Sequence, residues 1–342
     1  MTSQFSAQDV LRCDQCEAPV PSLYCIPCQV NLCKDCVEEH VVDESNEHNV
    51  VSTKHRLSTH YPEFSSTTEG KMPYKSWILS VIDTGYKELY SVAWLNDEEI
   101  WTSGKDKVLK LFNSEGYVVD TFQTKSGNAP SDITVTQTGT VIYADYSAET
   151  INEARNAKVY VAIHLLGWKP HGVCISSSGD LLVTMDSYDN KQTKVMCYSE
   201  SLEKQSIQWD NRGQLLYSCG GIKCLDENRN LDICVADYDA RAVVVVNATG
   251  NLRFKYTGVP SLNKNPFDPV GISTDSHGRI LAADCDNNLI HILDQDGPLL
   301  GYIDNCDLRA PWGICVDFYD NLYVAENATG RVKKIKYDEL SY

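Results

Sequence analysis

The sequence predicts a mainly β protein in which a small two-zinc domain is followed by a six-bladed β-propeller. Two observations support this prediction. Six cysteines and two histidines lie in close pairs within residues 13–48, and from residue 77 onward short apolar runs recur every 40 to 50 residues or so. The first pattern is typical of a zinc-stabilised fold, and the second is typical of propeller blades.

The composition places the chain among ordinary globular proteins. It has 342 residues, of which 42% are apolar and 23% are charged. No apolar run is long enough to span a membrane, and the segment from Met1 to Val10 lacks the apolar core of a signal peptide. Eight further cysteines lie mostly in apolar runs, as free thiols do in a reducing compartment. We therefore expect a cytoplasmic protein without a membrane partner.

The net charge argues against nonspecific nucleic-acid binding. The chain carries 47 acidic and 30 basic residues, a formal charge of −17 at pH 7. A surface of this sign repels phosphate backbones unless it holds a local basic patch. Sequence-specific contact with RNA remains an open alternative at this point.

The paired cysteines and histidines predict two structural zinc ions. Each Cys-x2-Cys knuckle presents two thiolates from one tight turn, and a helical segment and a polar loop then supply a histidine pair. The predicted ligands are Cys13, Cys16, Cys25, Cys28, Cys33, Cys36, His40 and His48. A segment this short needs metal binding to fold, and we expect no catalytic role for the zinc. Four ligand pairs can be shared between two ions in three ways, and spacing alone does not choose among them.

The order and spacing of these ligands resemble the B-box zinc finger of the tripartite-motif proteins. The resemblance covers roughly residues 12–53, including the Tyr24-Cys25 approach and the knuckle ending at Cys36. It implies a cross-braced arrangement in a domain spanning residues 8–53. The first zinc would then be held by Cys13, Cys16, Cys33 and Cys36, and the second by Cys25, Cys28, His40 and His48.

Residues 54–76 are predicted to be a flexible linker, because they contain Pro62, Pro73, Gly70 and a serine–threonine cluster without a helical apolar period. Two segments common in tripartite-motif relatives are not expected. Only twelve residues precede Cys13, none of them cysteine or histidine, so no RING finger is predicted. A short segment with two prolines cannot form several heptads, so no coiled-coil dimer is expected.

Residues 77–342 are predicted to form the propeller. An acidic residue closes an apolar run five times, at intervals of 41, 51, 47 and 42 residues: Asp145, Asp186, Asp237, Asp284 and Glu326. About four strand-length runs fit each interval, with blades beginning near Tyr90, Asp132, His171, Gly221, Val270 and Trp312. The last blade has only three strands, and residues 77–83 are expected to close the ring by pairing with residues 332–337. These repeats resemble NHL repeats, which implies an NHL-type (TolB-like) propeller.

The recurring acids have two interpretations. A carboxylate after a strand commonly accepts hydrogen bonds from the following turn, which gives it a structural role. Some six-bladed propeller hydrolases instead gather acids around a Ca²⁺ ion in the central channel. Blade one has Gly104 where the acid would stand. We favour the structural role.

The sequence contains no nucleophile elbow, phosphate-binding loop or His-Glu-x-x-His motif, so the expected function comes from the family resemblance. The resemblance to tripartite-motif proteins implies an adaptor that binds other proteins through the propeller and is not an enzyme in its own right. One alternative is a component of ubiquitin ligation that selects substrates. The other is an RNA-binding propeller, with Arg253, Lys255, Lys264 and Arg309 as candidate contacts.

Overall fold

The computed structural model describes Cys13 and residues 15–16, 23–25, 30–41, 50–52, 74–155, 158–259 and 264–338. The chain divides into two compact units, Met1–Tyr61 and Pro62–Tyr342. The division falls inside the segment predicted to be a linker. Most of that segment lies outside the described residues, so its flexibility stays a prediction.

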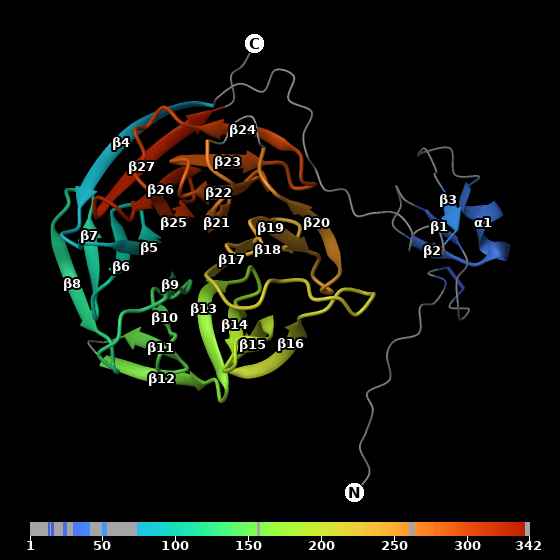
Figure 1. The fold of residues 1–342 in the computed structure, drawn as a ribbon, viewed down its shortest axis with the longest axis horizontal. Helices are drawn as coiled ribbons and strands as arrows, with labels where there is room; N and C mark the ends of the chain where they lie inside the picture. Colours follow the sequence, from blue (N-terminus) through green and yellow to red (C-terminus); the bar gives the residue numbers. More distant parts are fainter. Residues whose placement is uncertain are drawn as a thin grey trace, which may run out of the picture. The chain divides into compact units, whose positions relative to one another are not determined.

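The described residues of the first unit form one small sheet and one helix (Figure 1). Strand β1 (Leu23–Cys25) lies between β2 (Val30–Leu32) and β3 (Val50–Ser52), and both pairings are antiparallel. Helix α1 (Lys34–Val41) begins two residues after β2. Asp35 in its first turn and His40 in its last turn suit the two ends of the helix dipole.

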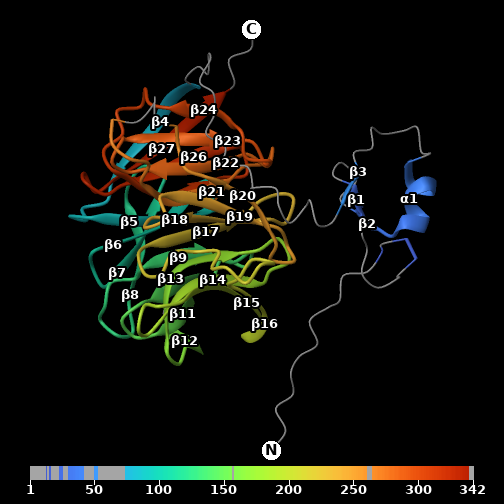
Figure 2. The ribbon, with the colours of Figure 1, turned by 45° about the vertical axis from the view of Figure 1, so that its right-hand side comes forward.

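The second unit is a six-bladed β-propeller, as predicted. Six four-stranded antiparallel sheets surround a centre, with the first strand of blades one to six innermost (Figures 1 and 2). Blades one to three are β5 (Leu89–Asn96), β6 (Glu99–Gly104), β7 (Val108–Asn113) and β8 (Val118–Gln123); β9 (Asp132–Val135), β10 (Val141–Asp145), β11 (Thr150–Arg155) and β12 (Lys158–His164); and β13 (Trp168–Ile175), β14 (Leu181–Ser187), β15 (Thr193–Ser199) and β16 (Leu202–Ile207).

The remaining blades repeat this order. They are β17 (Lys223–Glu227), β18 (Ile233–Asp237), β19 (Ala242–Val246) and β20 (Leu252–Tyr256); β21 (Pro269–Thr274), β22 (Ile280–Asp284), β23 (Leu289–Leu293) and β24 (Leu299–Ile303); and β25 (Pro311–Val316), β26 (Asn321–Glu326) and β27 (Arg331–Asp338) with β4 (Lys75–Asp83). The inner strands begin within three residues of the predicted blade starts.

The core lies between the blades. Strands β18 and β19 are buried along their whole length because both faces of their sheet are covered by neighbouring blades. Val243 and Phe254 of blade four pack in one cluster with Ile280 and Leu293 of blade five. Burial on both faces explains why the middle strands are continuous apolar runs, whereas the outer strand β8 is mostly exposed.

The ring is closed by β4, which is the outer strand of blade six and pairs antiparallel with β27. Val332 lies opposite Ile82, and Tyr337 lies opposite Ser76. Strand β4 begins at Lys75, two residues before the segment assigned to closure from the sequence. Because the first and last strands of the unit share one sheet, the final blade cannot form without residues from both ends of the propeller.

We expect Ile82→Ala to destabilise the propeller by about 2–4 kcal/mol, because it empties part of a packed core. The Ile82 side chain is 6% exposed and packs with Phe112 and Val332. The neighbouring Val81 is 47% exposed, so Val81→Ala should change the free energy of unfolding by less than about 0.5 kcal/mol. Urea unfolding of both variants measures the difference. Equal losses would mean that β4 does not close the ring through Ile82.

The propeller presents two faces, which we name by the direction of the inner strands. The entry face is where inner strands begin, as at Lys169 and Pro269, and the exit face is where they end, as at Ile175 and Thr274. The second strand of each blade runs antiparallel to the first, so the recurring acids at its end lie on the entry face. Within the described residues, no helix combines the length and apolar character needed to cross a membrane.

Candidate zinc site and entry face of the propeller

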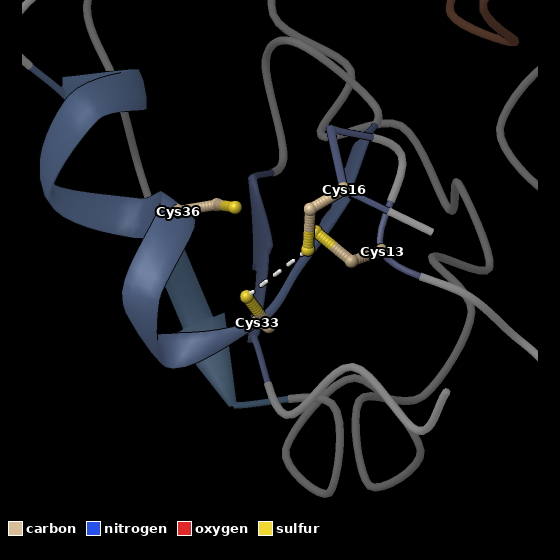
Figure 3. A group of neighbouring side chains, drawn as sticks. All are labelled: Cys13, Cys16, Cys33 and Cys36. Carbon is tan, nitrogen blue, oxygen red and sulfur yellow. Dashed lines mark hydrogen bonds between the residues drawn. The ribbon is translucent and has the colours of Figure 1, made fainter. Parts of the chain in front are cut away.

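The first unit brings together four cysteine side chains from two knuckles that are distant in sequence (Figure 3). The Sγ atoms of Cys13, Cys16, Cys33 and Cys36 all lie within 4.8 Å of one another, and those of Cys16 and Cys33 are 3.7 Å apart. Four thiolates that each lie about 2.3 Å from one tetrahedral zinc ion are about 3.8 Å apart. The cluster therefore has the donor atoms and the spacing that zinc requires.

The local fold favours the thiolate form of Cys13, whereas side-chain hydrogen bonds with Cys16 and Cys33 raise the pKa of Cys36. Cys33 precedes α1 and Cys36 lies in its first turn, where the helix dipole favours negative charge. Cys13 is 1% exposed. Burial raises the pKa of Cys13. Hydrogen bonds from the backbone N–H groups of Cys33, Gln15 and Cys16 lower it by a larger amount, so that the net pKa is about 6. A tight turn that donates several N–H groups to a sulfur is suited to holding a metal thiolate.

The other four predicted ligands are only partly described. His40 lies in the last turn of α1, and Cys25 ends β1. Cys28 and His48 lie outside the described residues. The second zinc and its ligand set therefore stay predictions.

The five recurring acids are buried at the ends of second strands. Their exposed fractions are 1% or less: Asp145, Asp186, Asp237, Asp284 and Glu326. Gly104 takes this position in blade one, where a Cβ atom would lie 2.3 Å from the Glu88 carbonyl oxygen. The backbone therefore occupies the space that a side chain fills in the other blades.

These carboxylates connect two loops on the entry face. Asp237 accepts hydrogen bonds from Ala240 N at 3.2 Å, in the turn that follows it, and from Ser218 N at 2.7 Å, in the loop entering blade four. In the same way Asp145 accepts from Ala148 N at 2.9 Å and from Asn128 Nδ2 at 3.1 Å. The sequence predicted the donors of the following turn but missed those of the incoming loop, which lies beside the acid because the first and second strands of each blade pair antiparallel. The carboxylates therefore hold the loops that connect consecutive blades.

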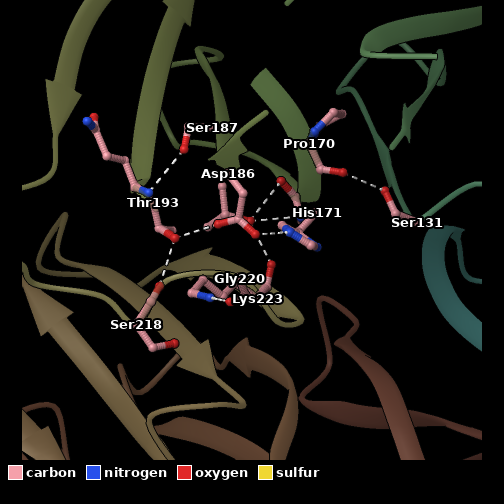
Figure 4. Close-up of polar contacts among 12 residues, drawn as sticks. Ser131, Pro170, His171, Asp186, Ser187, Thr193, Ser218, Gly220 and Lys223 are labelled. Carbon is pink, nitrogen blue, oxygen red and sulfur yellow. Dashed lines mark hydrogen bonds and ion pairs between the residues drawn. The ribbon is translucent and has the colours of Figure 1, made fainter. Parts of the chain in front are cut away.

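Asp186 is linked through Thr193 to the loop that enters the next blade (Figure 4). Its carboxylate lies 2.6 Å from His171 Nε2 and accepts a hydrogen bond from Thr193 Oγ1. The Thr193 hydroxyl also lies 2.7 Å from the carbonyl oxygen of Ser218, in the loop entering blade four. Burial raises the pKa of Asp186. The hydrogen bond and the charge of His171 together lower it by more than burial raises it, so the net pKa is below its usual range.

A lowered pKa makes Asp186 a source of acid sensitivity. The unfolded carboxyl group, with a pKa of about 3.9, binds protons more readily than the folded one. The stability that ionised Asp186 contributes to the fold is therefore present above about pH 4 and is lost as the pH falls further. We expect Asp186→Asn to reduce the loss of stability between pH 5 and pH 3, as measured by urea midpoints. The exposed Asp304→Asn is the control and should leave that loss unchanged. The same pH dependence in D186N and wild type would contradict this assignment.

An aromatic and basic cluster, which we call the tyrosine–lysine cluster, lies beside Asp186. It consists of Tyr146, Lys169, His171 and Tyr188. Lys169 Nζ is 5.3 Å from the Tyr146 ring centre and 4.8 Å from that of Tyr188, and the rings of Tyr146 and His171 are 4.9 Å apart. Tyr188 is 69% exposed. A sequence signal was present, because a tyrosine follows the recurring acid within two residues in blades two, three and four.

Three of the four basic residues considered for RNA binding have partners within the propeller. Arg253 forms ion pairs with Asp232 and Asp296, and Lys255 donates a hydrogen bond to the carbonyl oxygen of Leu216. Arg309 pairs with Asp307 at 2.7 Å. Acidic or carbonyl partners thus already engage these three side chains.

Comparison with known proteins identifies the first unit. The family model of the B-box zinc finger matches residues 8–53. No curated protein matches the sequence. A B-box binds zinc, which agrees with the four-cysteine cluster.

Solved structures similar to this chain are propellers of low sequence identity. A gluconolactonase from Xanthomonas campestris has a TM-score of 0.59 and 12% identity, over 78% of this chain and 90% of that chain. Virginiamycin B lyase from Staphylococcus aureus has a TM-score of 0.53 and 13% identity, over 79% of this chain and 89% of that chain. A protein described as a putative gluconolactonase has a TM-score of 0.57 and 14% identity, over 78% of this chain and 92% of that chain. At such identities these similarities establish the fold alone.

Proposed function

We propose that this chain, in which a B-box zinc finger precedes a six-bladed β-propeller, is a protein-interaction adaptor of the tripartite-motif type. The propeller, of the NHL type, is its recognition platform, and the B-box holds two structural zinc ions in the cross-braced arrangement. The observation that supports this function most directly is the tyrosine–lysine cluster, which lies on loops of a rigid ring. Tyrosine is enriched where proteins bind one another, and a rigid scaffold limits the entropy lost on binding.

The zinc arrangement is supported by the four sulfur atoms. Cys13 and Cys16 come from the first knuckle and Cys33 and Cys36 from the third, so the second knuckle is left to the other site. This alternation is the one that the tripartite-motif resemblance implies. The twelve cysteines whose side chains are described are free thiols, which supports a reducing compartment such as the cytoplasm.

The adaptor function can be tested by protein capture with matched tyrosine variants. The zinc-loaded chain is immobilised, bound proteins are identified by mass spectrometry, and the main candidate is then purified and titrated. We expect Tyr188→Ala to weaken the binding of that protein at least tenfold. Tyr117→Ala is the control, because Tyr117 is 66% exposed but lies between β7 and β8, away from the cluster. Equal binding by both variants would contradict recognition through the cluster.

The two alternatives give different results. A role in ubiquitin transfer predicts that the purified chain forms ubiquitin conjugates with a charged conjugating enzyme, and that Cys13→Ala abolishes them. RNA recognition predicts tight, sequence-dependent binding of single-stranded RNA at physiological salt that is lost in Lys169→Glu. Either result would replace the adaptor proposal.

A further inference from the structure

Two loops on the entry face of blade five bring two acids and a cysteine together. Cys285 and Asp286 follow β22, and Asp268 precedes β21 in the loop that enters the blade. One ligand atom of each residue, the Cys285 Sγ and a carboxylate oxygen of Asp268 and of Asp286, lies within 4.8 Å of the other two. Neither the zinc module nor the tyrosine–lysine cluster uses these side chains.

Backbone hydrogen bonds hold the two loops in this position. The Cys285 N–H group donates to the Asp268 carbonyl oxygen at 3.1 Å, and the Asp268 N–H group donates to the Asp284 carboxylate at 3.3 Å. Cys285 is buried and packs in the core cluster shared by blades five and six. The thiol and the Asp268 carboxylate are therefore fixed beside each other, and Asp286 is the exposed member of the group.

The Asp268 carboxylate has no partner in the part of the chain that the structure describes. Asp268 is 7% exposed, and no described residue forms a hydrogen bond or an ion pair with its carboxylate oxygens. The neighbouring Asp284 differs, because it accepts a hydrogen bond from Asn287 Nδ2 at 3.0 Å and lies 3.2 Å from His291 Nε2. Buried carboxylates are normally paired, hydrogen-bonded or bound to a metal ion. The side chain of Asp268 therefore points to a cation as its ligand.

The local charge also favours a cation. Burial, followed by the charges of Asp286 and Asp284, raises the pKa of Asp268 to about 6, although Arg241 lowers it by a smaller amount. Burial, followed by the charges of the three acids, raises the pKa of the Cys285 thiol to about 12. A divalent ion would offset the repulsion among these groups. Because a metal-bound thiol is deprotonated, its binding would release the Cys285 proton to solvent.

A second group of this kind on the propeller provides a contrast. Asp275, His277 and Asp320 also have ligand atoms within 4.8 Å of one another. However, Asp275 pairs with Arg279 at 2.6 Å, and Asp320 accepts a hydrogen bond from Ser276 Oγ at 2.6 Å. Both of these carboxylates already have partners within the chain. The blade-five group differs in having a buried carboxylate without a partner and a sulfur atom among its donors.

We propose that Asp268, Cys285 and Asp286 form a metal site on blade five, which binds a zinc ion through one thiolate and two carboxylate oxygens. The sulfur favours zinc over magnesium and calcium, which prefer oxygen ligands alone. Donor atoms around a tetrahedral zinc ion are roughly 3.4–3.8 Å apart, so side-chain rotations that move them by about 1 Å complete the site. Three protein donors leave the fourth position to water or to a group of a partner protein. The site does not rest on the adaptor function.

The test counts zinc on the full chain. Wild type and variants are dialysed to equilibrium against one buffer of fixed micromolar free zinc, and the zinc held by each chain is measured by mass spectrometry. We expect Asp268→Asn and Cys285→Ala each to hold one zinc ion per chain fewer than wild type. The B-box is the same in all of these proteins, so its zinc cancels in the comparison. Thermal melting confirms that the variants remain folded.

Two control variants match these changes. Cys306→Ala removes another buried cysteine of the same core cluster, and Asp304→Asn changes an exposed acid. Neither residue belongs to the blade-five group, so both variants should keep the zinc content of wild type. A zinc count in Asp268→Asn or Cys285→Ala equal to that of wild type would overturn the proposed site.

Cobalt in place of zinc identifies the donor atoms. The spectrum of Cys285→Ala, subtracted from that of wild type, should leave the near-ultraviolet absorption of one thiolate–cobalt bond, whereas subtraction of the Cys306→Ala spectrum should leave none. A difference spectrum without thiolate absorption would contradict the role of Cys285. Either negative result leaves the adaptor function standing, because that function is tested separately by partner binding in Tyr188→Ala.

Discussion

Replacing Cys36 with serine is expected to release at least one zinc ion and to unfold the first unit, while the propeller keeps its melting temperature. Structural zinc contributes apparent binding free energies of about 10–16 kcal/mol in small modules. A unit with three-residue strands and one eight-residue helix has little core to replace that contribution. Zinc content by mass spectrometry and amide dispersion by NMR report the two effects.

The matched control is Cys219→Ser in the propeller. Cys219 is an exposed free thiol that is not part of the cysteine cluster. This variant should keep the zinc content and the spectrum of the wild type. Retention of both zinc and amide dispersion by C36S would contradict the assignment of Cys36 as a zinc ligand.

Replacing Gly271 with alanine is expected to destabilise the propeller by about 3 kcal/mol and to lower its melting temperature by roughly 6–12 °C. A Cβ atom at this position would lie 1.9 Å from the Trp312 carbonyl oxygen on the neighbouring inner strand. Because the obstacle is backbone, no side chain can rotate aside. Strands β21 and β25 must move apart, and this movement opens the centre of the ring.

Gly127→Ala is the control for this substitution. No heavy atom lies within 4 Å of the Cβ position there, and φ is +83°. It should therefore cost only the roughly 1–2 kcal/mol of a left-handed non-glycine residue. Differential scanning calorimetry compares the two variants. A melting temperature of G271A at or above that of G127A would show that the inner strands do not need their close approach.

Most of the propeller could be predicted because each blade repeats a pattern of residue types that can be recognised in the sequence. Apolar runs such as 233–237 and 242–246 are continuous because both faces of each blade are covered, and the acid that ends the second strand recurs at blade-length intervals. The need for glycine at position 271 was not recognised from the sequence, although a glycine before isoleucine recurs in the next blade at Gly313. The contact that requires it lies between two strands about 40 residues apart in sequence.

The sequence alone was enough to predict a zinc-binding module, the number of blades and the strand that completes the last blade. These features follow from residue types and from their spacing along the chain. It could not show that the knuckles of Cys13 and Cys33 meet, or that Asp237 holds the loop entering blade four through Ser218. Those facts depend on distances across the folded ring and module. Ligand spacing and strand period constrain only the local chain, whereas tertiary packing determines which distant groups become partners.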